Sequence, residues 1–70
     1  MMPILTYGLK NNETPTLENI RTCCEIAKRC NCIIHLWWYV QYSGWYDIFL
    51  FPESNPEEEF EKGVPLVYGV

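Results

Sequence analysis

Apolar positions recur along the chain with two different periods, and the change of period marks the expected elements. Residues 17–30 carry apolar side chains at three- and four-residue spacing, which predicts a helix with one buried face. Thr14 or Thr16 is expected to cap this helix, with Pro15 at its first position and Asn31 at its end. The apolar face consists of Leu17, Ile20, Cys23, Cys24, Ala27 and Cys30.

Segments rich in β-branched and aromatic residues flank this helix and predict strands. Residues 3–7 read as a short strand that Gly8 ends. Residues 32–40 and 45–51 read as a hairpin that turns at Ser43-Gly44. This hairpin contains every tryptophan of the chain.

The last part of the chain predicts a second helix and a final strand. Asn55 is a suitable N-cap, Pro56 suits the first helical position, and Gly63 is the expected stop. Residues 64–70 then read as a strand, placed at a sheet edge by Pro65.

The resulting element order, β-α-β-β-α-β, is the ferredoxin-like order. It predicts one α+β domain over residues 1–70, with a four-stranded antiparallel sheet and one long and one short helix on one face. The strand 45–51 is expected to lie between the strands 3–7 and 32–40. The other face of the sheet would be open, and the element order carries no function by itself.

The hairpin register decides which aromatic side chains are buried, because a slip of one residue exchanges the two faces. A three-residue loop, Tyr42-Ser43-Gly44, is favoured over a two-residue loop at Ser43-Gly44. The favoured register predicts a core face of Ile34, Leu36, Trp38, Val40, Tyr46, Ile48 and Leu50. The opposite face would hold Ile33, His35, Trp37, Tyr39, Gln41, Trp45, Asp47, Phe49 and Phe51. With the shorter loop, Trp38, Val40, Trp45 and Phe49 would share a face instead.

The second of these faces mixes aromatic rings with polar tips, which is typical of a binding surface. We expect the partner-binding residues to be Trp37, Tyr39, Gln41, Trp45, Asp47 and Phe49. The favoured partner is a protein, either a second copy in a homodimer or a dedicated partner that the chain would inhibit. Two alternatives stay open: the chain's own loop or tail covers this face, or a planar ligand such as a nucleotide stacks on it.

Composition and charge limit the classes of partner that the chain could bind. An apolar share of 49% is too high for a disordered chain. The net charge is −4, and residues 36–70 carry six acidic groups and one basic group, so phosphate backbones and anionic membranes are disfavoured. A secondary acidic contact is expected at Glu57, Glu58, Glu59 and Glu61. With no targeting segment and no apolar run long enough for a membrane span, a cytoplasmic location is expected.

Catalytic and metal chemistry find little support. Four cysteines lie between positions 23 and 32, but helical geometry sets Cys23 and Cys30 ~10.5 Å apart along the axis, too far for one disulfide or one zinc ion. Buried, reduced cysteines are expected. His35, Asp47 and Tyr39 share a face, yet the favoured register sets Asp47 opposite Tyr39, so no direct bond between His35 and Asp47 is expected. No catalytic residue, metal or cofactor is predicted.

Overall fold

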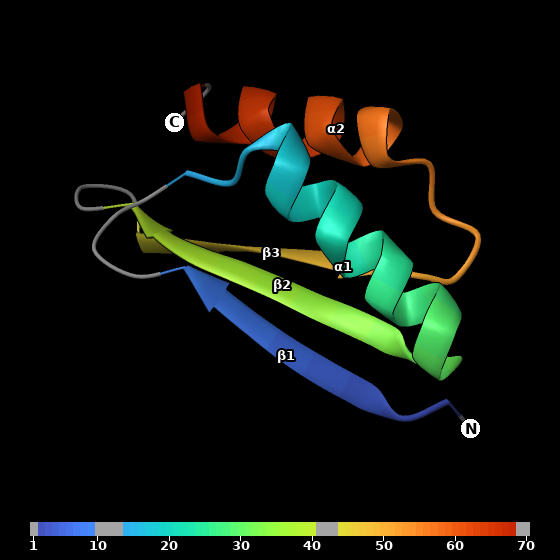
Figure 1. The fold of residues 1–70 in the computed structure, drawn as a ribbon. Helices are drawn as coiled ribbons and strands as arrows, with labels where there is room; N and C mark the ends of the chain where they lie inside the picture. Colours follow the sequence, from blue (N-terminus) through green and yellow to red (C-terminus); the bar gives the residue numbers. More distant parts are fainter. Residues whose placement is uncertain (1, 10–13, 41–43, 69–70) are drawn as a thin grey trace.

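The computed structural model describes residues 2–9, 14–40 and 44–68, with side chains for all of these except 39, 40, 44 and 63–68. The elements are β1 (Ile4–Leu9), α1 (Leu17–Cys30), β2 (Ile33–Val40), β3 (Gly44–Leu50) and α2 (Pro56–Tyr68). They form an α+β fold in which both helices lie on one side of a three-stranded mixed sheet (Figure 1). Over the described ranges, no helix has the length and apolar character needed to cross a membrane.

The strand order corrects the predicted sheet. The order is β1-β2-β3, and β1 pairs in parallel with β2 without interruption from Ile4–Ile33 to Leu9–Trp38. β3 therefore does not lie between β1 and β2. The first strand also does not end at Gly8 as predicted, because β1 continues to Leu9. A βαβ unit with α1 as its crossover brings its two strands side by side, and the hairpin return then takes the outer edge.

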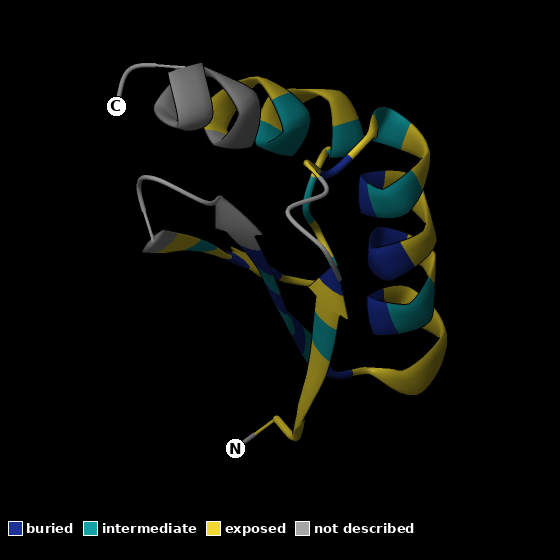
Figure 2. Cartoon of the chain, turned by 90° about the vertical axis from the view of Figure 1, so that its left-hand side faces the viewer, coloured by how far each residue is buried: buried dark blue, intermediate teal, exposed yellow. Residues whose placement is uncertain are grey.

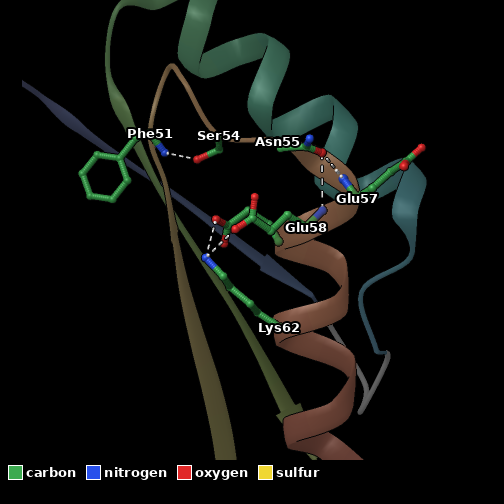
Figure 3. A network of polar contacts seen from close by, with 7 residues as sticks. Phe51, Ser54, Asn55, Glu57, Glu58 and Lys62 are labelled. Carbon is green, nitrogen blue, oxygen red and sulfur yellow. Dashed lines mark hydrogen bonds and ion pairs between the residues drawn. The ribbon is translucent and has the colours of Figure 1, made fainter.

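The second helix begins as predicted and ends differently (Figure 3). Asn55 caps it, since its Oδ1 accepts hydrogen bonds from the N–H groups of Glu57 at 3.0 Å and Glu58 at 3.4 Å. The helix then continues past Gly63 to Tyr68, so the predicted strand at residues 64–70 is wrong over residues 64–68, and four strands are not found in the described ranges. Formation of the first turn is the costly step of helix formation. The cap and the acidic residues stabilise that turn, so the helix can then extend.

The first helix matches its predicted span of residues 17–30, with Thr16 as its N-cap. Thr16 N–H donates to Asn19 Oδ1 at 2.9 Å, and Asn19 N–H donates to Thr16 Oγ1 at 3.2 Å. Pro15 consequently precedes the cap and does not occupy the first helical position as predicted. Asn31 ends the helix in the left-handed conformation, with φ of 49°, which confirms the predicted stop.

The core lies between α1 and the helix-facing side of the sheet. Its buried residues are Leu9, Ile20, Cys23, Cys24, Ala27, Cys32, Ile34, Leu36, Trp38, Ile48 and Leu50. The helical face is confirmed except at Leu17, which is half-buried, and at Cys30, which is exposed. The helix ends at Cys30, the chain turns at Asn31, and Cys32 takes the buried place beside the sheet.

Cysteine reactivity should follow this burial. Burial, with a smaller effect from Cys24, raises the pKa of the Cys23 thiol to about 11, and burial also raises the pKa values of Cys24 and Cys32. Because the thiolate is the reactive form, we expect native protein to take one iodoacetamide label, at Cys30, and unfolded protein to take four. Mass spectrometry counts the labels. Cys30→Ser is the control, and equally fast labelling of Cys23 in the native state would contradict the buried position.

Candidate functional site

The sheet face opposite the helices is the candidate site, and it is called the open face below. No helix or strand of the described ranges crosses it, as Figure 2 shows with both helices on the other side of the sheet. Strand alternation, continued one residue past β3, places ten residues with described side chains on this side. They are Ile4, Thr6, Gly8, Ile33, His35, Trp37, Trp45, Asp47, Phe49 and Phe51.

The hairpin register confirms the predicted faces and corrects the predicted pairs. Val40 pairs with Gly44, so three residues, 41–43, connect the strands, one position earlier than predicted. Each residue of β3 therefore moves by two positions relative to β2. An even shift keeps every side chain on its face, but Asp47 now lies opposite Trp37 in place of Tyr39, and Phe49 lies opposite His35.

That shift brings His35 and Asp47 together. The distance from His35 Nε2 to Asp47 Oδ1 is 2.6 Å, so the prediction that they do not bond directly is wrong. An ionised carboxylate only accepts hydrogen bonds, which makes Nε2 the donor. The imidazole also stacks on Phe49, with ring centroids 4.8 Å apart and planes 11° apart. The ring of His35 is thus held at its edge by Asp47 and on its face by Phe49. Asp47, the one carboxylate among the described residues of the open face, has a partner.

Two tryptophans form the second fixed group of the open face. The indole of Trp37 lies over Gly8 on the neighbouring strand, so closely that a Cβ added to Gly8 would lie 2.5 Å from Cζ2. Trp45 meets Trp37 edge to face, with centroids 6.3 Å apart and planes 88° apart. Trp37 is half-buried, whereas Trp45 remains 59% exposed and Phe49 48% exposed. The inner rings support outer rings that are presented to solvent.

The predicted site residues are only partly brought together. Trp37, Trp45, Asp47 and Phe49 share the open face, as predicted. The backbone of Tyr39 pairs with Trp45, its side chain is not among those described, and Gln41 lies outside the described residues.

The acidic segment does not join this surface. It begins α2, on the helix side of the sheet (Figures 1 and 3). Glu57 lies 3.5 Å from Arg21, and Lys62 lies 3.6 Å from Glu58 and 3.4 Å from Glu59. These ion pairs and the helix dipole account for three of the four glutamates without a partner molecule. The fourth, Glu61, is exposed on the same helix.

Sequence reasoning missed the contribution of β1 to the open face. Ile4, Thr6 and Gly8 lie there because β1 pairs with β2, and the predicted topology had placed β3 between them. No local feature of residues 1–9 would have indicated this, because the place of β1 depends on which other strands are present to pair with it.

The fold and its site define a class: a small α+β protein with a three-stranded mixed sheet, two helices on one face and an aromatic surface on the other. Comparison of the chain with protein-family models, with curated proteins and with solved structures gives no match.

Proposed function

We propose that the protein is a small, non-enzymatic protein-binding module that acts through its open face, with a second copy of the chain as the partner. The observation that carries the proposal is the exposure of Trp45 and Phe49, whose rings are already held by contacts with Trp37 and His35. Aromatic residues dominate the energetics of protein interfaces, and rings held in place lose little entropy on binding.

A second copy suits this face in shape and in charge. Two sheets pack face to face at ~10 Å with interdigitating side chains, which matches a face made of three strands. Among its described residues, the open face has one carboxylate, Asp47, and the bond of Asp47 to His35 avoids burying an unpaired carboxylate. A domain of 70 residues gains little stability from its own core, so further burial of apolar surface is favourable. A dedicated partner protein, which the chain would inhibit, would use the same anchors.

Sedimentation velocity over the micromolar range tests the proposal. The double variant Trp45→Ala/Phe49→Ala removes the two most exposed rings among the described side chains of β2 and β3 and should lower the mean mass relative to wild type. Glu25→Ala, on the exposed side of α1, is the control and should behave as wild type. A wild-type monomer at every concentration, or a double variant that sediments like wild type, would count against pairing through the open face.

A planar ligand is the second candidate, favoured by the same exposed rings. The open face has no lysine or arginine among its described residues, so a nucleotide phosphate would find no cationic partner there. The ligand would stack on Trp45 or Phe49 and should quench tryptophan fluorescence in a saturable way, and this quenching should weaken in Trp45→Phe. An unchanged emission across a panel of planar compounds removes this candidate.

A further inference from the structure

The strand β1 is incompletely covered by its own chain. It lies at an edge of the sheet, so one side of its backbone has no neighbouring strand in the described ranges. Ile4 is 60% exposed and Leu5 44% exposed, although they point to opposite faces. Leu5 is on the helix side, where the equivalent residues of β2 are fully buried, because the helices lie over β2 and β3 (Figure 2). β1 therefore exposes an edge and apolar side chains on both faces.

This edge lacks the usual protection against pairing with another chain. Proteins block exposed edges with charged side chains, prolines or bulges. Residues 4–9 have no charge and no proline, and their pairing with β2 runs without a bulge. The opposite edge differs, since β3 carries Asp47 and its helix-side residues Ile48 and Leu50 are buried. The two edges of the sheet are thus unlike, and β1 is the one open to a further strand.

One hydrogen bond shows which backbone groups of β1 are free. Ile33 N–H donates to Pro3 C=O at 2.9 Å, so the carbonyl of Pro3 points toward β2. Because the directions of the N–H and C=O groups alternate along a strand, the backbone groups of Leu5, Tyr7 and Leu9 also point toward β2. The N–H and C=O groups of Ile4, Thr6 and Gly8 point away from it.

We propose that β1 pairs antiparallel with β1 of a second copy across a two-fold axis at Thr6. With the axis there, Thr6 faces Thr6 of the second copy and Ile4 faces Gly8 in both directions, so three residue pairs exchange about six hydrogen bonds. An axis at Leu5 or Tyr7 would leave only two such pairs within β1. The free groups of the edge therefore select the register.

Side chains fit the same register. Leu5 lies opposite Tyr7 of the second copy on the helix side, in the close, non-hydrogen-bonded type of pair, and each would cover the other. On the open face, Ile4 lies opposite Gly8 of the second copy, where a large side chain meets a residue with none. The indole of Trp37 over that glycine then offers Ile4 an apolar contact. The most exposed residues of β1 are the ones that gain partners.

Pairing of this kind would join two sheets into one of six strands. Its width would be ~29 Å against ~14 Å for three strands, at ~4.8 Å between strands, and the two open faces would become one continuous surface. This pairing uses the edge and not the face, so it does not depend on the proposed function.

Charge at position 6 tests both the pairing and its axis. Thr6→Lys and Thr6→Glu each set like charges directly opposite across the axis, so each should sediment at half the wild-type mass, with a dissociation constant raised ~10-fold or more. An equimolar mixture of the two variants should recover the wild-type mass, because Lys then faces Glu. Thr22→Lys, an exposed threonine on α1, is the matched control, and far-UV circular dichroism confirms that each variant is folded.

Because the Thr6 side chain lies on the open face, a loss of mass in the Thr6 variants assigns the contact to the edge only where Trp45→Ala/Phe49→Ala keeps the wild-type mass. Thr6→Lys at wild-type mass, or a wild type that is monomeric throughout the micromolar range, would overturn the edge pairing. If Thr6→Lys and Thr6→Glu each sediment at half the wild-type mass and their equimolar mixture does so too, the axis at Thr6 is wrong. The double variant Trp45→Ala/Phe49→Ala leaves the edge intact. If the double variant loses mass while Thr6→Lys keeps the wild-type mass, the contact between copies lies at the open face and not at β1.

Discussion

Replacing Trp38 with alanine is expected to lower the free energy of unfolding by ~3–5 kcal/mol, the largest effect of any single substitution considered for this chain. Trp38 is fully buried on the helix side of β2, and its ring stacks on Tyr46 with centroids 5.5 Å apart. Removal of the indole leaves a cavity that neighbouring strands cannot fill without moving. A domain of this size has few kcal/mol to lose, so much of the variant should be unfolded at 25 °C.

Trp45→Ala is the matched control for this prediction. It removes the same side chain from the same hairpin, but from the open face, where Trp45 is largely exposed. The expected loss is ~1 kcal/mol or less, mainly the edge-to-face contact with Trp37. Urea unfolding followed by circular dichroism measures both variants. Equal losses would mean that the two faces of the hairpin are not the unlike surfaces described above.

The assignment of Trp38 and Trp45 to opposite faces was predictable from the sequence, and the reason is parity. The predicted and observed registers differ by two positions, which changes the neighbours of each residue but not the side to which it points. Leu36, Ile48 and the other aliphatic residues of one face also had no alternative partner as good as the apolar side of α1. Burial therefore fixes the face more firmly than the turn fixes the register.

The positions of β1 and of residues 64–68 were not predictable in the same way. Val64, Pro65 and Val67 have the local preferences of an edge strand, but a helix nucleated at Asn55 continues through them. Without a fourth strand, the reason for inserting β3 beside β1 disappears, and β1 pairs with β2 directly. Local propensity could not reveal either outcome, because both depend on which strands are present to pair.

The candidate site was predictable as a group of residues and not as a geometry. The bond between His35 and Asp47 exists only because Asp47 lies one diagonal step from His35, and the predicted register had set them further apart. Trp37 over Gly8 likewise requires β1 beside β2. The binding function of this surface stays a prediction, for which the fixed rings are the support.

Gly8→Val is expected to lower the free energy of unfolding by ~1–3 kcal/mol, because its Cβ would overlap the indole of Trp37. On sequence preference alone the effect should have the opposite sign, since valine favours strands and glycine does not. The expected loss is therefore a direct consequence of one ring lying on one glycine. Movement of that ring should also change the tryptophan emission spectrum.

A double-mutant cycle separates this overlap from other effects of valine. In a Trp37→Ala background the indole is absent, so Gly8→Val should become neutral or stabilising, and the coupling between the two sites should be ~1–3 kcal/mol. Measurement at two protein concentrations separates folding from association, because only association makes the unfolding midpoint depend on concentration. If Gly8→Val lowers the free energy of unfolding equally with and without Trp37, the indole does not lie on Gly8. The described contact between β1 and the aromatic residues of β2 would then be wrong.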